Sequence, residues 1–117
     1  MATKNKNATR YFSDAHEKSV CKALGAIQTP NSGATKWRKG DTVVPGTMLV
    51  ECKTTMSEKQ SVSIKKEWID KNKEEAFEMR LPNSCICINF GPDTDNYYVI
   101  SEKLMKYLVE KLKEDNE

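Results

Sequence analysis

Two carboxylates and an ammonium lie close together in the segment from Gly40 to Thr55, which reads GDTVVPGTMLVECKTT. They belong to Asp41, Glu51 and Lys53. Oxygen ligands of this kind suit Mg²⁺ or Mn²⁺, and Mg²⁺ is usually held by one or two carboxylates together with water and phosphate oxygens. A lysine beside such an ion can orient or deprotonate an attacking water, or neutralise charge on a phosphate. The segment therefore predicts metal-dependent cleavage of a phosphodiester.

The elements expected here bring the three side chains together. Met48–Lys53 is a short, mostly apolar run after a Pro-Gly turn, so we expect a strand in which Glu51 and Lys53 share one face. Asp41–Val44 is predicted to be its hairpin partner, which returns Asp41 toward Glu51. A glutamate and a lysine two residues apart are also common on the wet face of an ordinary strand. The Gly-Asp pair before the turn and the two threonines after the lysine favour the metal site.

The order of these residues resembles the PD-(D/E)xK nuclease signature. Asp41 is followed, after nine intervening residues, by the Glu-Cys-Lys of residues 51–53, and Gly40 stands where the signature has proline. Glu17, in the first predicted helix, and the Ser-Gly pair at residues 32–33 add two further matches. From about residue 14 to residue 98, the chain is thus similar to archaeal-type Holliday junction resolvases and to the small phage-encoded nucleases that resemble them.

The resemblance implies a role for each site residue. Asp41 and Glu51 would hold Mg²⁺, with Mn²⁺ as a substitute, and the backbone carbonyl of Cys52 would complete the set of ligands. Lys53 would assist the water that attacks the phosphate. Glu17 would bind a second cation or a water held by the first.

Two of these matches have a plainer reading. Glu17 lies three residues after Asp14, which is also the spacing of a capping box at the start of a helix ending around Gly25. In the loop before the motif, Ser32 can donate a hydrogen bond to a phosphate and Gly33 lets the backbone approach closely. The same loop also reads as a polar connection rich in turn residues.

Basic side chains flank the predicted metal site, and we expect them to contact DNA phosphates without neutralising the carboxylates. Ordinary solvated charge is the alternative reading. Trp37 lies within one basic run, where it either packs against DNA or anchors the core beneath the hairpin. The residues expected to bind DNA are Arg10, Ser32, Gly33, Lys36, Arg38, Lys39, Lys65 and Lys66.

A chain of 117 residues is sufficient for one hydrophobic core. We expect a flexible basic N-terminal arm at residues 1–10 and a single nuclease domain at residues 11–117. No apolar stretch approaches the ~20 residues that cross a bilayer, and residues 1–10 are polar, so we expect no membrane association and a cytoplasmic location, in the host if the protein is phage-encoded. The four cysteines form no CxxC or His-Cys cluster, which predicts buried, reduced thiols.

The remaining pattern predicts an α/β fold. A helix is expected over about residues 64–80, a strand over 84–90, its antiparallel partner over 97–100, and an amphipathic helix from Ser101 to about Lys113. The full order is helix, hairpin, helix, hairpin, helix. It favours a restriction-endonuclease-like sandwich, with a central mixed β-sheet flanked by helices.

The leading hypothesis is a metal-dependent, structure-selective DNA endonuclease, a Holliday junction resolvase that nicks four-way junctions in recombination or repair and leaves 5′-phosphates. Such an enzyme is expected to be a homodimer, because two symmetric nicks require two sites. The last strand and helix are either the dimer surface or internal. The alternatives are a repair or restriction-type nuclease on flaps, ends or duplex DNA, a noncatalytic DNA-binding protein with a nuclease-like fold, and a small interaction module whose ExK motif is accidental.

Overall fold

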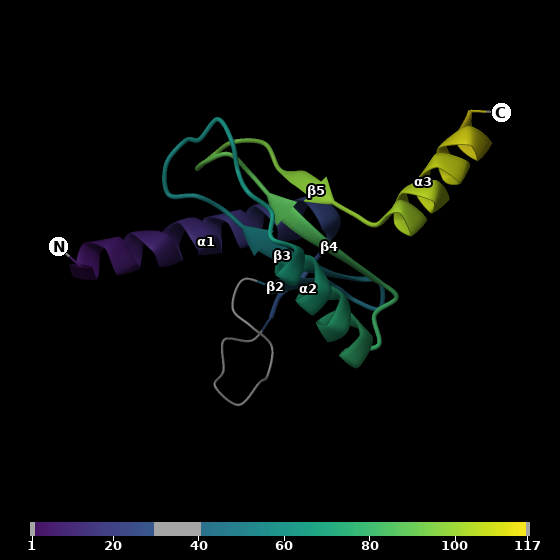
Figure 1. The fold of residues 1–117 in the computed structure, drawn as a ribbon, viewed down its shortest axis with the longest axis horizontal. Helices are drawn as coiled ribbons and strands as arrows, with labels where there is room; N and C mark the ends of the chain where they lie inside the picture. The colour runs from purple at the N-terminus through teal and green to yellow at the C-terminus, as the bar shows by residue number, and fades with distance from the viewer. Residues whose placement is uncertain (1, 30–40, 117) are drawn as a thin grey trace.

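The computed structural model describes residues 2–29 and 41–116, which form three helices and a five-stranded sheet (Figure 1). The helices are α1 (Ala2–Leu24), α2 (Lys66–Glu78) and α3 (Glu102–Asp115). The strands are β1 (Ile27–Gln28), β2 (Asp41–Val44), β3 (Met48–Lys53), β4 (Asn83–Ile88) and β5 (Tyr97–Val99).

The sheet is mixed and has the strand order β1-β2-β3-β4-β5. Strands β3 and β4 are parallel, whereas the other neighbours are antiparallel. The β2–β3 hairpin turns at Gly46, whose φ of 66° suits a residue without a Cβ. The parallel pair needs a crossover, and α2 supplies it. The predicted α/β class with a mixed sheet flanked by helices is confirmed.

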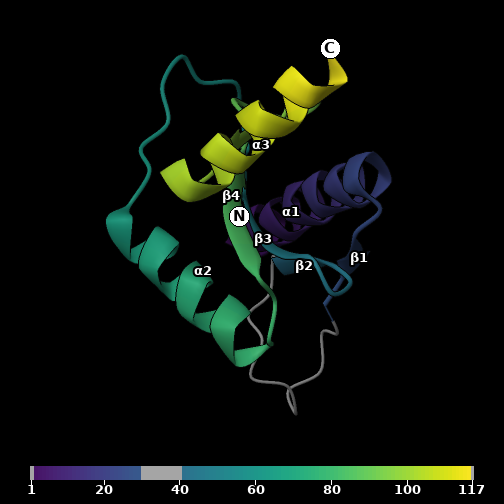
Figure 2. The ribbon, with the colours of Figure 1, turned by 90° about the vertical axis from the view of Figure 1, so that its right-hand side faces the viewer.

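Helices α1 and α2 cover opposite faces of the sheet (Figure 2). On the α1 side, Val20 packs with Val50, Cys85 and Cys87 in the buried core. Side chains alternate along a strand, so Leu49, Glu51 and Lys53 of β3 face the α2 side. The predicted nuclease residues therefore lie on the face covered by α2.

His16 of α1 is buried beside the core sulfurs, with its Nε2 atom 3.4 Å from Sγ of Cys87. Burial lowers the pKa of His16 and raises the pKa of Cys87 to about 11. The pKa of Cys85 rises to about 12, through burial first and the neighbouring Cys87 second. The thiols of Cys85 and Cys87 are buried as expected, whereas the other two cysteines are only partly buried.

Helix α1 begins at Ala2, so the prediction of a capping box that starts a helix at Asp14 is wrong. No glycine or proline interrupts residues 2–24, and the helix ends at Gly25, whose φ is 68°. Asp14 lies inside the helix and forms an ion pair with Lys18 one turn later. The flexibility expected of residues 1–10 stays a prediction.

Helix α3 matches the expected amphipathic helix, and Ser101 caps it by accepting a hydrogen bond from the backbone N–H of Leu104 at 3.1 Å. None of its residues is buried, so the alternative that α3 is internal is wrong. Among the helices of the described residues, none is long and apolar enough to cross a membrane.

Candidate functional site

Asp41 and Glu51 are direct partners in the antiparallel ladder between β2 and β3. Partners in such a ladder point to the same face, with Cβ atoms about 4.5–5.5 Å apart. Asp41 is 1% exposed and Glu51 is 3% exposed. The hairpin therefore brings the two predicted metal ligands together on the α2 face, as expected from the sequence.

Lys53 extends the pair toward solvent. Its Nζ atom lies 3.4 Å from Oε2 of Glu51, and its side chain is 33% exposed, against 4% for the glutamate side chain. The ammonium thus stands at the outer edge of a buried acidic pair.

The ring of Trp68 lies against the ammonium of Lys53. The sequence alone did not predict this residue as part of the site. Lys53 Nζ lies 4.6 Å from the centroid of the Trp68 ring, and Nζ of Lys65 lies 5.8 Å from the same ring. These are cation–π distances. The signal in the sequence is the Lys-Lys-Glu-Trp run at the start of α2, where a tryptophan in the first turn lies among cations.

The carboxylates of Asp41 and Glu51 are oxygen donors of the kind that hard divalent cations prefer. Two buried carboxylates side by side repel each other and lose hydration, which costs free energy unless positive charge lies nearby. Within the trio of Asp41, Glu51 and Lys53, one ammonium faces two carboxylates. Carboxylate oxygens are the donors that Mg²⁺ and Mn²⁺ prefer.

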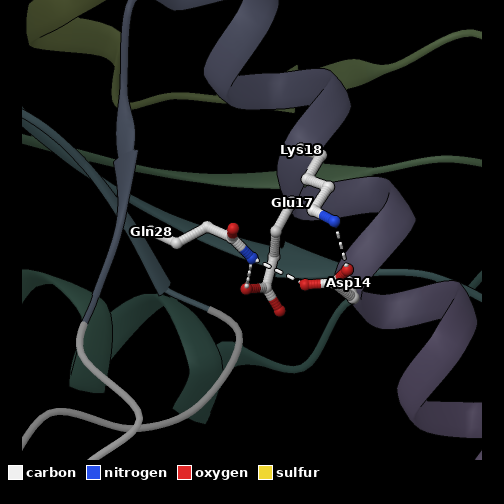
Figure 3. A network of polar contacts seen from close by, with 4 residues as sticks. All are labelled: Asp14, Glu17, Lys18 and Gln28. Atoms are coloured by element: carbon white, nitrogen blue, oxygen red, sulfur yellow. Dashed lines mark hydrogen bonds and ion pairs between the residues drawn. The ribbon is translucent and has the colours of Figure 1, made fainter.

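Glu17 lies on the other face of the sheet. Its Oε1 atom accepts a hydrogen bond of 3.1 Å from Nε2 of Gln28, and that amide also donates to Oδ1 of Asp14 at 3.0 Å (Figure 3). Gln28 is the ladder partner of Thr42, so it points away from the face that carries Asp41. Across the described residues, no group of three or more His, Cys, Asp or Glu side chains is placed to hold a metal ion. Glu17 is therefore not a third ligand in this arrangement.

The two acids of α1 have opposite electrostatic environments. Burial raises the pKa of Glu17, against the effect of the Gln28 hydrogen bond, and the negative charge of Asp14 adds to the rise. The Gln28 hydrogen bond and then Lys18 lower the pKa of Asp14. Glu17 is thus the acid of this pair that more readily holds a proton.

Of the residues expected to bind DNA, the structure brings one to the site. Lys65 lies against Trp68, beside Lys53. Lys66 instead pairs with Asp70 at 2.7 Å and is 85% exposed, so it points elsewhere. Six expected DNA-contacting side chains lie outside the part that the structure describes: Arg10, Ser32, Gly33, Lys36, Arg38 and Lys39.

Cys52 lies between Glu51 and Lys53 in β3, so its backbone is close to both groups. Its side chain takes the opposite face and packs against the core. Burial is the largest cause that raises the pKa of this thiol. The sulfur is therefore a core group, and only the backbone of Cys52 belongs to the candidate site.

Comparisons of the chain with family models, with characterised proteins and with solved structures find no match. The functional assignment therefore depends on the residues and geometry of this chain.

Proposed function

We propose that the protein is a Mg²⁺-dependent DNA endonuclease. The observation that carries the proposal is the convergence of Asp41, Glu51 and Lys53 on one face, with the acids buried and the ammonium at the solvent edge. Buried charges in proteins are usually paired or coordinate metal ions. The order of these residues also resembles the PD-(D/E)xK signature, with Gly40 in place of its proline, and this resemblance supports a nuclease of the restriction-endonuclease-like kind.

Asp41 and Glu51 would hold the ion, together with the backbone carbonyl of Cys52. A bound Mg²⁺ supplies Lewis-acid chemistry, which polarises a phosphoryl oxygen and makes water a better nucleophile. Lys53 stabilises negative charge on the scissile phosphate, and Trp68 restricts where its ammonium can lie. Lys65, on the same ring, is suited to bind a neighbouring phosphate.

The substrate we infer is branched DNA, with a four-way junction as the leading candidate and cleavage products that carry 5′-phosphates. The resemblance to junction resolvases supports this choice, and so do the basic residues just before Asp41 in the sequence, Lys36, Arg38 and Lys39. Such an enzyme would act on recombination or repair intermediates in the cytoplasm, in a host cell if the protein is phage-encoded.

The test is cleavage of a labelled four-way junction, compared with matched linear duplex, flap and single strand. Wild type is assayed with Mg²⁺ and with EDTA, beside Glu51→Gln and the control Glu74→Gln, which alters an exposed glutamate of α2. We expect paired nicks on the junction that require Mg²⁺, persist in the control and are lost with Glu51→Gln.

Metal-dependent cutting without junction preference would keep the nuclease and reassign its substrate to flaps, ends or duplex. Absence of cutting on every substrate, combined with DNA binding, would overturn catalysis in favour of a noncatalytic DNA-binding protein. Cutting that survives both EDTA and Glu51→Gln would show that the activity belongs to a contaminant or to another site.

A further inference from the structure

A groove of about 810 Å³ lies between α2, the β4–β5 side of the sheet and the first turns of α3. Its volume is within the range of about 300–1,000 Å³ that small-molecule sites occupy. Asp41, Glu51 and Lys53 do not line it, so it is a second concave surface beside the candidate nuclease site. The proposed cleavage chemistry gives this groove no role.

Most of the groove's lining is apolar, and it comes from several elements of the fold. Walls of this kind, with only a few polar groups among them, are typical of sites that enclose the body of a small molecule. Because the walls belong to two helices and two strands, the groove exists only in the folded chain. The apolar and aromatic side chains that line it include Ile69 of α2, Ile86 of β4, Val99 of β5, Ile100, and Leu104 and Tyr107 of α3.

Asn72 of α2 also lines the groove and is only 2% exposed. Its Nδ2 atom is buried and has no hydrogen-bond partner among the described residues. Leaving a buried donor unpaired costs free energy, and native proteins satisfy most groups of this kind. An acceptor atom supplied by a bound molecule would remove this cost.

The other polar groups of the lining differ in whether the chain itself engages them. Asn83 donates to the carbonyl of Thr47 at 3.1 Å, and Ser101 caps α3. Lys73 of α2 and Lys103 of α3, in contrast, form no ion pair within the part of the chain that the structure describes. No aspartate or glutamate of that part lines the groove either. One buried donor and two cations therefore favour an anion with hydrogen-bond acceptors.

We propose that the groove binds a small carboxylate with an apolar body, of the kind that a medium-chain fatty acid represents. The carboxylate accepts a hydrogen bond from Nδ2 of Asn72, and Lys73 and Lys103 balance its charge. The apolar body lies against the apolar lining. Nucleic acid suits this groove less well, because phosphates and sugars are bound mainly by polar and charged groups and this lining is mostly apolar.

The first test is calorimetric titration of the whole chain with decanoate, in the absence of divalent metal and of DNA. We expect one site per chain with a Kd below roughly 1 mM. Decylammonium has the same chain length and the opposite charge, and it should bind at least about tenfold more weakly. Equal affinity for the two ions would overturn the proposal, because binding would then depend on apolar surface alone. Absence of any decanoate binding would overturn it as well.

Asn72→Leu removes the unpaired donor and keeps the branching of the side chain. Decanoate should bind this variant about 10- to 100-fold more weakly, the loss expected for a hydrogen bond to a charged group. The Tm should not fall, because the substitution leaves no buried polar group without a partner. A folded variant that binds decanoate as tightly as the wild type would contradict the role of Asn72.

The lysines have a matched control. Lys73→Gln with Lys103→Gln should weaken decanoate binding by roughly 2- to 30-fold, as expected for two exposed cations. Lys71→Gln with Lys106→Gln makes the same change of charge, with one substitution in each helix, at exposed positions that do not line the groove. It should bind as the wild type does. Equal weakening by both pairs would show that only net charge matters and would overturn the assignment to this groove.

A further variant separates the groove from the apolar side chains that α3 exposes elsewhere. Leu108 and Leu112 are 41% and 61% exposed and do not line the groove, so Leu108→Gln with Leu112→Gln should leave the Kd of decanoate within about twofold. Loss of binding in this variant would move the site to the exposed face of α3. A DNA duplex that displaces decanoate would reassign the lysines to nucleic acid. Since the titration contains neither metal nor DNA, its outcome is independent of the cleavage result.

Discussion

Asp41 and Glu51 lie opposite each other in one ladder with almost no exposure to solvent. Such a pair is costly for a stable hairpin, because both carboxylates lose hydration and repel each other. At the scale of single residues, the metal hypothesis therefore makes a prediction about unfolding as well as about cleavage.

Mn²⁺ should stabilise the wild type and not Asp41→Asn. A ligand that binds only the folded state adds about 2.7 kcal/mol at 100 times its Kd, which amounts to roughly 10 °C in Tm for a chain of this size. Thermal unfolding with and without Mn²⁺ measures the gain, and calorimetry measures the heat of binding. Glu74→Gln should respond as the wild type does. Equal gains for Asp41→Asn and wild type would eliminate this metal site.

Trp68→Leu should slow single-turnover cleavage by about 3- to 30-fold, the loss expected when a cation–π contact no longer holds Lys53. Trp68→Tyr should recover most of the rate, because a tyrosine ring can still lie beneath the ammonium. A structural defect alone would affect both variants alike. Equal rates for Leu and Tyr at this position would therefore show that Trp68 is not a positioning residue.

His16 should make stability fall at acidic pH. Burial lowers the pKa of His16 in the folded state below its ordinary value of about 6.5, so protonation favours unfolding. The contribution is fully present above pH ~6.5 and is lost as the pH falls toward the folded-state value. The difference in unfolding free energy between wild type and His16→Gln should shrink from pH 7.5 to pH 5. A constant difference would contradict the prediction.

At the scale of elements, the segment between β3 and α2 is pinned to the turn after β4. Lys59 N–H donates to the carbonyl of Phe90 at 2.8 Å, and Thr54 Oγ1 donates to Oδ1 of Asn89 at 2.6 Å. Gly91 allows the close approach, since a Cβ there would lie 2.7 Å from the Cα of Glu58. The segment joins Lys53 to the helix that carries Trp68, so its anchoring orients the site.

Gly91→Ala should cost about 2–3 kcal/mol of unfolding free energy, because its φ of 140° is a region that only glycine adopts readily and because the new methyl group meets backbone. Gly46→Ala is the matched control. Its φ is also positive, at 66°, but nothing lies within 4 Å of the added Cβ, so a cost of about 1 kcal/mol is expected. Denaturant unfolding compares them, and equal costs would show that the contact with Glu58 does not matter.

The elements differ in how far local sequence determines them. The β2–β3 hairpin and the end of α1 were predictable, because turn chemistry and glycine act over a few residues. The start of α1 was not, because the spacing of Asp14 and Glu17 suits a capping box and a helix interior equally well. The separation of Glu17 from the pair of acids depends on which face of the sheet α1 covers, which only tertiary packing decides. Trp68 was missed because its role requires the distance between α2 and β3.

At the scale of the whole molecule, α1 and α2 cover the mixed sheet, whereas no residue of α3 is buried. Amphipathic spacing predicted α3, but no local pattern states whether an apolar face is buried within the chain or by another copy. The site and α3 are separate features of this fold. A homodimer, which is expected because two symmetric nicks require two sites, carries two nuclease sites, and its main consequence is the timing of two cuts.

A supercoiled plasmid with an extruded cruciform separates paired cuts from single ones. Two nicks within one encounter give linear DNA, whereas independent nicks give open circles. Wild type should produce mainly linear product. Leu108→Gln with Leu112→Gln alters exposed positions of α3, where the dimer surface is expected, and should lose at least about tenfold of that product in favour of open circles, because the second cut is no longer intramolecular. Lys106→Gln with Glu110→Gln should behave as the wild type. A monomeric variant that still linearises the plasmid would show that pairing does not need the α3 interface, and a wild-type dimer that cuts nothing would reject the nuclease while the dimer stands.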